Sequence, residues 1–519
     1  MHVAVLWTFA IAFPLFQLFD NSPDYLVAQD NGWPDLPLVA AALVLVPPTA
    51  VTVAEACLGR WPPAGRVLRQ VVLGGLFAAL VLQVLKGEFD PGRRSLVLIA
   101  ILAGVFFGFL YARGRFVPTL LSVLAPLPLV ALVWFLGFSR VSEIAFGADD
   151  GQEVGRTQVS VPVVLVIFDE LSAASLGEGG EIDNRLGAFR RIARTSTWFP
   201  NATTVADNTT RAVPAILTGR MPAKDALPIA SELPPSIFDR VSGPFNVEEP
   251  ITDLCGRGCD DGAWTTHARE LISSMVDLTK RRLRRGDLPD RVGLPQDALD
   301  TRAEDFESWS AGIVDGLNVL HIELPHNPYQ YAGHGRYSES LVTPGLTGET
   351  WTTDSAVVEQ GESRYLAQLD FTDRLLGQLI DRLERRGIWD RALVIVTADH
   401  GVAFVPGKSR RNVAVETFGE IAGVPLFVKA PGQTRPELSR AAVRTTDVLP
   451  TVGDHLGANW RLPGQSLRTP RSRRETVVSA QFGPPVRMPP AFYERLRRKA
   501  AERLAQAEPF SRLEGGAGE

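Results

Sequence analysis

The stretch Val159-Ser160-Val161-Pro162-Val163-Val164-Leu165-Val166-Ile167-Phe168-Asp169-Glu170 decides the kind of fold that this chain adopts. Most residues before Asp169 are apolar and many are β-branched, which is typical of a strand buried on both faces of a sheet. Similar runs recur at Asn318–Leu324, Leu393–Thr397 and Val424–Val428, with helical patterns between them. Strands and helices that alternate in this way predict an α/β sandwich around a mostly parallel central sheet.

The composition changes along the chain and predicts four parts: an apolar part at 1–138, a polar linker at 139–158, the α/β domain at 159–470, and a polar tail with one helix at 471–519. Within the α/β domain, helical patterns cover 184–196, 267–285 and 362–386. The pattern at 267–285 ends in a cluster of Lys and Arg. Such a cluster usually forms a solvated helix end. Contact of these side chains with anionic lipid or polymer is the alternative interpretation.

The first part holds five apolar spans, each long enough to cross a bilayer as a helix, at 3–19, 37–57, 68–85, 95–112 and 116–138. No small-residue cleavage site follows the first span, and four more spans come after it, so an anchor is favoured over a signal peptide. These spans also account for a mean hydropathy of +0.05 in the whole chain. We therefore expect a multi-pass membrane domain.

Charges in the loops predict the orientation of these spans. The loop from Asp20 to Asp35 has four Asp and no Lys or Arg, so it should lie outside. Loops with Arg60, Arg66 and Arg69, and with Arg113 and Arg115, should lie inside; the loop with Lys86, Arg93 and Arg94 argues mildly the other way. The best fit places the chain in the cytoplasmic membrane with everything after Arg140 outside. A formal net charge of −5 gives no indication of nucleic-acid binding.

The chain has three cysteines. Cys57 lies in an apolar run, and Cys255 and Cys259 are spaced C-x-x-x-C. With no His or second Cys pair nearby, this spacing argues against a zinc site. A local disulfide is expected if this part faces an oxidising compartment, and two free thiols stay open as the alternative.

A hydroxyl residue begins the stretch Asn208-Thr209-Thr210-Arg211-Ala212-Val213-Pro214-Ala215-Ile216-Leu217-Thr218-Gly219-Arg220, which has the pattern of a short helix. Backbone N–H groups at a helix start favour an anion beside the hydroxyl, so we interpret Thr209 as a nucleophile. A threonine that simply caps a helix is the alternative, because capping is a common role of threonine. The other segments decide between the two.

Reactive side chains follow three of the expected strands. Asp169 and Glu170 end the first, His326 follows the second, and Asp399 and His400 end the third. Functional sites of open α/β sheets form beyond the carboxyl ends of the strands, so these side chains should converge near the threonine loop. An acid after a strand often caps the next helix, but this many together with a hydroxyl favour a metal site.

The domain from about 160 to 470 resembles the sulfatase-like branch of the alkaline phosphatase superfamily. The resembling pieces are Val166–Glu170, Thr209 with Leu217–Arg220, Leu324–His326, Ala398–Gly401, Val424–Leu426, and Thr446–Thr451 with Pro463–Leu467. The apolar N-terminal part resembles that of membrane-anchored members such as lipoteichoic acid synthases and phosphoethanolamine transferases.

The resemblance implies a role for each candidate residue. Asp169 matches the first acidic metal ligand, and Asp399 with His400 matches the later ligand pair. Thr209 matches the nucleophile, which also binds the metal. His326 matches a histidine that contacts the transferred group or the leaving oxygen. The second ligand aspartate of many sulfatases is replaced here by Glu170. One divalent ion is expected, and such ligands suit Mn²⁺, Mg²⁺, Zn²⁺ or Ca²⁺.

One departure from the family bears on the substrate. True sulfatases have Cys or Ser at the position of Thr209, which becomes formylglycine, and threonine cannot form that aldehyde. Threonine here resembles the phosphoryl-transferring members. We therefore expect transfer of a phospho-alcohol head group from a membrane lipid donor to an envelope glycan or lipid acceptor, in a bacterium, through a phospho-threonine intermediate. A phosphodiester or sulfate-ester hydrolase and a catalytically silent assembly protein are the alternatives.

Overall fold

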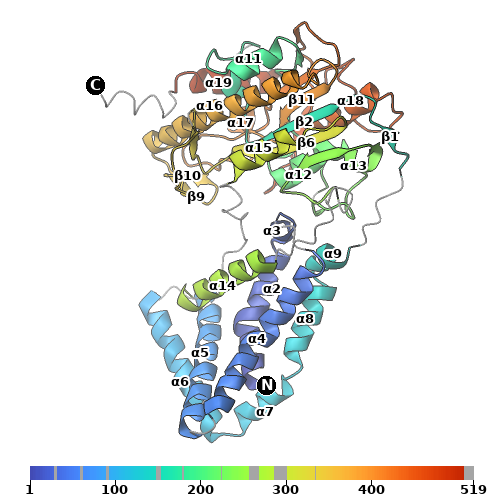
Figure 1. The fold of residues 1–519 in the computed structure, drawn as a ribbon. Helices are drawn as coiled ribbons and strands as arrows, with labels where there is room; N and C mark the ends of the chain where they lie inside the picture. The colour runs from blue at the N-terminus through green and yellow to red at the C-terminus, as the bar shows by residue number, and fades with distance from the viewer. Residues whose placement is uncertain are drawn as a thin grey trace. The chain divides into compact units, whose positions relative to one another are not determined.

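The computed structural model describes residues 1–28, 32–58, 62–88, 93–147, 154–177, 180–223, 225–255, 268–285, 301–333 and 335–507. The chain divides into two compact units. The first consists of Met1–Ala148 with Ala263–Leu294, and the second of Asp149–Gly262 with Pro295–Glu519. Figure 1 shows the helices and strands of both units.

The first unit is a helical bundle. Its helices are α1 (His2–Trp7), η1 (Thr8–Ala12, a π-helix), α2 (Phe13–Asp20), α3 (Pro23–Val27), α4 (Asp35–Cys57), α5 (Pro62–Glu88), α6 (Arg93–Arg113), α7 (Phe116–Val123), α8 (Leu127–Gly137), α9 (Val141–Phe146) and α14 (Ala268–Arg285). Five segments are long and apolar enough to cross a membrane: His2–Asp20, Asp35–Cys57, Ala64–Leu85, Ser95–Arg113 and Phe116–Gly137. The five expected spans are thus present as helices.

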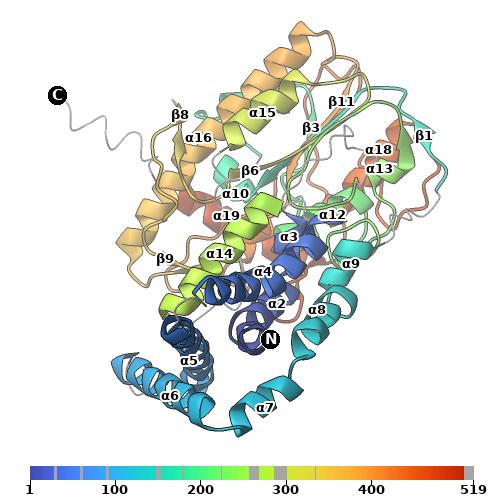
Figure 2. The same cartoon turned by 60° about the horizontal axis from the view of Figure 1, so that its bottom comes forward.

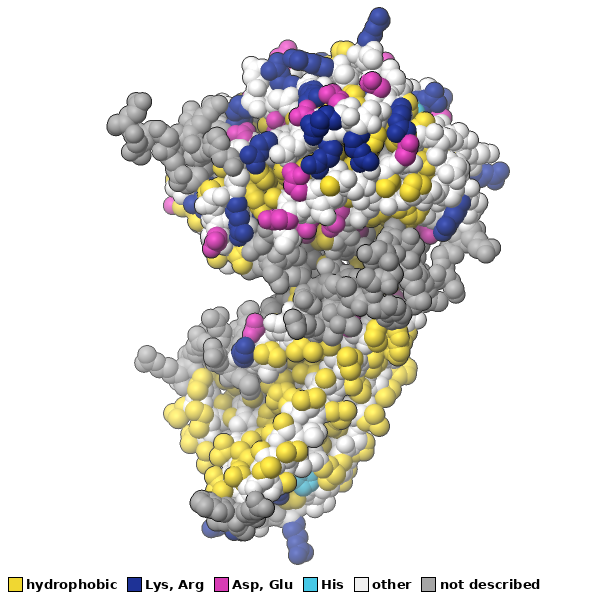
Figure 3. All heavy atoms as spheres, viewed as in Figure 1, with side chains coloured by type: hydrophobic (Ala, Val, Ile, Leu, Met, Phe, Trp, Pro, Cys, Tyr) yellow, Lys and Arg dark blue, Asp and Glu magenta, His cyan; other side chains and the backbone are white. Residues whose placement is uncertain are grey.

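The surface of the bundle fits membrane anchoring. Val105 and Phe106 in α6 are 67% and 62% exposed, and hydrophobic side chains cover much of this unit in Figure 3. Large exposed apolar surfaces are unusual in soluble proteins. The fifth span breaks into α7 and α8 around Pro126, because proline cannot donate the hydrogen bond that a continuous helix needs.

Three segments far apart in sequence meet at one end of the bundle. The Arg140 N–H donates to Asp20 Oδ1 at 2.8 Å, and the Tyr25 hydroxyl donates to Ser274 Oγ in α14 at 2.7 Å. The Asp-rich loop, the exit of the chain at Arg140 and α14 therefore share this end.

Helix α14 was expected within the α/β domain, yet the structure groups it with the bundle. Leu271 and Met275 are buried in the same hydrophobic cluster as Leu36 and Val39 of α4. Figure 2 shows α14 beside α4. An amphipathic pattern predicts that one face of a helix is covered, but not which surface covers it.

The second unit is built on a seven-stranded sheet with the order β13 (Glu437–Leu438), β3 (Thr197–Trp198), β12 (Leu426–Lys429), β11 (Leu393–Ala398), β2 (Val163–Asp169), β6 (Leu317–Pro325) and β5 (Phe245–Glu248). Strand β2 is parallel to β11 and β6, and β5 is parallel to β6. Strand β12 is antiparallel to both of its neighbours. The mostly parallel sheet is thus confirmed.

Helices cover both faces of this sheet, because β2 alternates between two hydrophobic cores. Val164, Val166 and Phe168 belong to one core, and Leu165 and Ile167 to the other. The first core includes side chains of α10 (Ala173–Leu176), α11 (Gly187–Ala193), α15 (Arg302–Ala311), α16 (Ser355–Arg385) and α19 (Pro490–Leu504). The second includes side chains of α12 (Thr209–Thr218), α13 (Ile237–Arg240) and α18 (Val448–His455). The three-layer α/β sandwich is confirmed.

Short elements complete the unit: β1 (Thr157–Gln158), β4 (Val241–Ser242), β7 (Tyr331–Ala332), β8 (Gly335–Arg336), β9 (Leu346–Thr347), β10 (Thr350–Trp351), α17 (Phe418–Ile421), η4 (Thr445–Asp447), β14 (Thr476–Val478) and β15 (Val486–Met488). Helix α16 begins earlier than expected because Asp354 caps it, accepting from the Ala356 N–H at 3.0 Å. In the polar tail, α19 is the expected helix, and the β14–β15 hairpin was not expected.

The cysteines separate into two states. Cys57 is free and exposed, whereas Cys255 is disulfide-bonded. Cys259, the partner suggested by the spacing, lies outside the described residues.

Candidate active site

Asp169 lies at the carboxyl end of β2, where the pairing with β6 shifts register after Phe168. The residue is 1% exposed, and neither carboxylate oxygen has a hydrogen-bond partner in the described part of the chain. Burial and the nearby Asp399 carboxylate raise the pKa of Asp169 well above its ordinary value. Burying a carboxylate without hydrogen bonds costs free energy, and a bound cation would offset that cost.

Asp399 and His400 follow the neighbouring strand β11 and bring their side chains to the same place. The ligand atoms of Asp169, Asp399 and His400 all lie within 4.8 Å of one another. Asp399 Oδ1 accepts from the Glu170 N–H at 3.2 Å, while Oδ2 has no hydrogen-bond partner among described residues. Burial raises the pKa of Asp399 to about 7.

The tautomer of His400 follows from its contacts. Its Nδ1 lies 3.0 Å from the Gly401 carbonyl, which can only accept, so Nδ1 carries the proton. Burial and the positive charge of Arg411 hold the pKa of His400 well below its ordinary value, so the ring is neutral. The Nε2 lone pair is then directed at Asp399 Oδ2, 3.3 Å away. Two electron-rich atoms face each other, and a bound cation would make that contact favourable.

Thr209 is the first residue of α12, and Asn208 is the N-cap. Its hydroxyl oxygen lies 3.5 Å from His400 Nε2 and accepts from Arg411 Nη2 at 3.3 Å. The side chain is buried among the groups that the sequence predicted to converge. The Asn208 side chain instead donates to Thr210 Oγ1 at 2.8 Å.

Together, these four residues form a donor set of two carboxylates, one neutral imidazole and one hydroxyl, which suits a divalent ion. The unpartnered oxygens of Asp169 and Asp399 are the observation that fits such an ion. The identity of the ion does not follow from this donor set.

Glu170, the neighbour of Asp169, has different surroundings. Arg410 Nη1 donates to Glu170 Oε2 at 2.5 Å, and Arg411 Nε lies 2.9 Å from Oε1. Its backbone has φ +62°, and among described residues no other non-glycine residue has a positive φ. Such conformations are strained and concentrate at functional sites. Burial raises the pKa of Glu170 even though both arginines act against the shift.

His326 lies on the other side of Glu170. Its Nε2 is 3.6 Å from Glu170 Oε1 and 3.5 Å from Arg410 Nη2. Arginine can only donate, so that contact leaves the His326 proton on Nδ1, which has no partner among described residues. Burial and Arg411 lower the pKa of His326 well below its ordinary value. Gln368 in α16 holds this loop by donating to the His326 carbonyl at 2.6 Å.

The structure brings together all six residues that the sequence singled out. Their ligand atoms include a second close group, Asp169, Glu170 and His326, again within 4.8 Å of one another. Glu170 was predicted as a metal ligand, and here two arginines occupy its carboxylate. Whether it also binds metal stays a prediction.

The two arginines were missed by the sequence analysis. Arg410 and Arg411 follow Lys408 and Ser409 in a loop with no periodic pattern, and a basic loop is ordinarily solvated. Arg410 is buried and also pairs with Glu349, its Nε 2.7 Å from Glu349 Oε2. The short distance from Asp399-His400 along the chain was the only signal available.

Residues 316–458 match the family model described as Sulfatase. That stretch contains His326, Asp399, His400 and both arginines, but not Asp169 or Thr209. A similar curated protein is the ulvan-active sulfatase of Formosa agariphila, 24% identical over 355 residues, which are 61% of this chain and 67% of that protein.

Other matches are shorter or more distant. The multifunctional alkaline phosphatase superfamily protein PehA of Trinickia caryophylli is 29% identical over 115 residues, 22% of each chain. The chain therefore spans about two thirds of the first relative and about a fifth of the second. A solved phosphonate monoester hydrolase from Silicibacter pomeroyi is 19% identical, with a TM-score of 0.41 over 62% of this chain and 79% of that one. The matches to the Sulfatase model and to the ulvan-active sulfatase agree with the sulfatase-like resemblance that the sequence predicted, and they indicate an enzyme of the hydrolase type.

Proposed function

We propose that this sulfatase-like domain transfers a phospho-alcohol head group from a membrane lipid to an envelope glycan or lipid, with Thr209 as the nucleophile. One observation carries the proposal. The Thr209 hydroxyl lies at a helix start, 3.3 Å from an arginine guanidinium and beside buried carboxylates, in a chain that also has five apolar spans. A lipid donor is available to a protein anchored in the bilayer.

The residues of the site divide the work of the first half-reaction. Thr209 Oγ1 attacks phosphorus, the Oγ1–P bond forms, and the bond from phosphorus to the lipid oxygen breaks. Arg411 stands beside the nucleophile and offsets negative charge on the phosphoryl oxygens. The proton of the Thr209 hydroxyl ends on the departing lipid oxygen, so the lipid leaves as an alcohol, and the neutral His326 can donate a hydrogen bond from Nδ1 to that oxygen.

A divalent ion fits Asp169, Asp399, His400 and Thr209, because their electron-rich atoms converge without enough hydrogen-bond donors. When bound, Mn²⁺, Mg²⁺, Zn²⁺ or Ca²⁺ would lower the pKa of the threonine hydroxyl and screen the charge of the substrate. In the second half-reaction, an acceptor hydroxyl takes the group from Thr209. The threonine hydroxyl is thereby restored.

The proposed location is the cytoplasmic membrane, with the α/β domain on its outer side. The Asp-rich loop and the exit at Arg140 share one end of the bundle, and acidic loops favour the outer side. The disulfide bond of Cys255 supports an oxidising compartment.

The test is mass spectrometry of the peptide containing Thr209 after the purified protein has been incubated with native membranes. A phospho-alcohol adduct on Thr209 that is absent from Thr209→Ala is the expected result. Thr210→Ala is the matched control, because Thr210 is the adjacent residue and its hydroxyl bonds to Asn208 rather than to the site. Turnover retained in Thr209→Ala would end the proposal.

A second candidate is a hydrolase of phosphodiesters or sulfate esters, and the sulfatase family match favours it. Water would then take the place of the acceptor. Sulfate-ester hydrolysis through formylglycine does not suit this chain, because Thr209 cannot form the aldehyde. Product analysis with and without an added glycan acceptor separates the two activities, since only a transferase attaches the head group to the glycan.

A further inference from the structure

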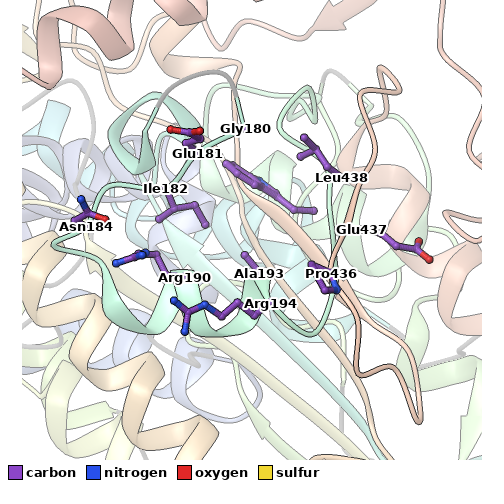
Figure 4. A pocket seen from close by; sticks show the side chains of 11 residues that line it. Gly180, Glu181, Ile182, Asn184, Arg190, Ala193, Arg194, Pro436, Glu437 and Leu438 are labelled. Carbon is purple, nitrogen blue, oxygen red and sulfur yellow. The ribbon is translucent and has the colours of Figure 1, made fainter.

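A cavity with a volume of about 500 Å³ lies between the edge strand β13 of the central sheet and α11 with its preceding loop. Figure 4 shows its lining side chains, with Arg190 and Arg194 on one side and Leu438 on another. None of the residues of the active site lines this cavity. It is therefore a separate feature of the α/β unit that the reaction does not use.

The apolar part of the cavity is rigid. Trp198 is 5% exposed and stacks on Phe427 in the core, with ring centroids 5.6 Å apart and an interplanar angle of 18°. Ile182 and Leu438 complete this surface, and Leu438 is 48% exposed. Gly180 keeps the rim narrow: its φ is +104°, and a Cβ there would stand 3.0 Å from Leu438 Cδ2.

One polar group in this wall lacks a partner. The Trp198 indole Nε1 is buried and has no hydrogen-bond partner in the described part of the chain. Buried donors are nearly always satisfied, because an unmade hydrogen bond costs roughly 1–3 kcal/mol. This nitrogen is enclosed by protein atoms, so the cavity presents the apolar ring of Trp198 and not its N–H.

Two of the three arginines at the C-terminal end of α11 line the cavity. Arg191 is engaged elsewhere, since its Nη1 and Nη2 pair with Asp381 and Glu384, each at 2.5 Å. Arg190 and Arg194 line the cavity instead, and neither has an ion pair with any described residue. They are four residues apart, so both project from one side of the helix end.

Two acidic residues also line the cavity, and neither cancels these charges. Glu437 Oε2 accepts from Thr197 Oγ1 at 3.1 Å, and its carboxylate points away from the other labelled side chains in Figure 4. Glu181 is exposed. The free polar groups of the cavity are therefore mainly two guanidinium groups beside an apolar wall.

We propose that this cavity is a binding site for an anionic sugar residue of the glycan on which the enzyme acts. A sugar ring offers an apolar face to Trp198, Ile182 and Leu438, and its carboxylate or sulfate group pairs with Arg190 and Arg194. The binding itself is independent of catalysis, and only the role of the glycan as substrate or acceptor rests on the proposed function.

The test is calorimetric titration of the full-length protein in detergent micelles. The probes are a sulfated heparin tetrasaccharide, tetragalacturonic acid and the neutral maltotetraose. We expect both anionic probes to bind and maltotetraose to bind at least about tenfold more weakly. The ratio of the two anionic affinities tells sulfate from carboxylate as the preferred group.

Variants then locate the site. Arg190→Ala/Arg194→Ala should weaken both anionic probes at least about tenfold, whereas Arg191→Ala should leave them unchanged. Equal binding by the double variant, equal loss in Arg191→Ala, or equal binding of maltotetraose would overturn the proposal. If the double variant does not fold, Arg194→Gln, at an exposed position, carries the same test.

The active-site variant Thr209→Ala separates this proposal from the proposed function. It should bind the anionic tetrasaccharides as tightly as the unaltered protein. Loss of binding in Thr209→Ala would mean that the probes occupy the active site, which refutes the separate cavity. In the unaltered protein, binding of the anionic probes without any transfer to a glycan would refute the proposed function alone.

Discussion

The two carboxylates that end β2 are neighbours in sequence and have opposite surroundings. Asp169 has no hydrogen-bond partner among described residues and faces Asp399, whereas Glu170 is held between Arg410 and Arg411. We call Asp169, Asp399, His400 and Thr209 the acidic half of the site, and Glu170, His326, Arg410 and Arg411 the arginine half.

The difference indicates two kinds of ligand. The acidic half gathers negative and lone-pair atoms that a cation would hold together, as in metal sites. The arginine half is already balanced by charges of this chain, and Arg411 extends from it to Thr209. A cation from solution and an anion from the substrate would therefore meet at the threonine, where the two halves join.

The largest expected effect is at that junction. Thr209→Ala removes the nucleophile while both halves keep their charges, so turnover should fall on the order of 10⁶-fold, as when a serine protease loses its nucleophile. Thr209→Ser should retain part of the activity because it keeps a hydroxyl. Turnover of a lipid substrate is the measurement, with bound metal determined in parallel. A small loss in Thr209→Ala would show that another group forms the bond.

The next effect breaks the acidic half. Asp399→Asn removes one negative charge from the donor set, so affinity for the divalent ion should fall at least about 100-fold. Elemental analysis of the purified protein, followed by titration with Mn²⁺ or Zn²⁺, measures this loss. The fold should survive, because Asp399 Oδ2 makes no hydrogen bond in the described structure. A protein that holds no metal before substitution would instead favour the catalytically silent alternative.

Glu170→Gln breaks the arginine half in the opposite way. It leaves the guanidinium groups of the buried Arg410 and the partly buried Arg411 with less negative charge, and removing one partner of a buried ion pair typically costs about 3–5 kcal/mol of folding free energy. Denaturant unfolding should show this loss while metal content stays near that of the parent. If metal is lost as well, Glu170 is a ligand as the sequence predicted, and the two halves are one site.

A smaller effect is expected at Arg411. Lysine keeps the charge but cannot reach Glu170, Asp169 and Thr209 together with one planar group. Arg411→Lys should therefore raise KM for an anionic substrate about tenfold to 100-fold, which corresponds to roughly 1.5–3 kcal/mol for charged hydrogen bonds. Lys408→Ala is the matched control, because Lys408 is in the same loop and pairs with Glu416 at the surface. Metal content should not change in either variant.

The acidic half could be predicted from the sequence, and the arginine half could not. Asp169 ends the apolar run of Val163–Asp169, and Asp399 follows the apolar run of Leu393–Ala398. Parallel strands bring their carboxyl ends to one edge of the sheet, so both positions could be predicted from the sequence. Arg410 and Arg411 lie in an irregular loop whose path depends on tertiary packing. Periodicity carries no information there, and the burial of a basic loop is the exception.

The same reason explains the fold-level differences. Buried strands and membrane spans carry long apolar signals, so their positions were predicted within a few residues. Helix α14 has an apolar face of helical period, but nothing in that face names the surface that Leu271 and Met275 contact. The β14–β15 hairpin is short and lies in a polar tail, where alternation over three residues cannot be told from chance.

Another buried carboxylate of the α/β unit has surroundings between those of Asp169 and Glu170, and we expect the smallest effect from its substitution. Glu362 in α16 is buried and shares Arg503 with Glu420, at 3.2 Å and 2.6 Å. Burial raises the pKa of Glu362 to about 7 from 4.5. Its contribution to stability is thus full below pH 4.5 and is lost as pH rises through about 7.

Glu362→Gln should remove that loss, because Arg503 keeps Glu420 as its partner. We expect the variant to be more stable than the parent by about 1–3 kcal/mol at pH 8, and by little at pH 5. Denaturant unfolding at the two pH values measures the difference, and Glu359→Gln, at an exposed position of the same helix, is the control. A Glu362→Gln protein that is less stable at pH 8 would mean that one shared arginine is enough to stabilise a buried carboxylate. The absence of a hydrogen-bond partner at Asp169 would then be a weaker argument for a bound cation.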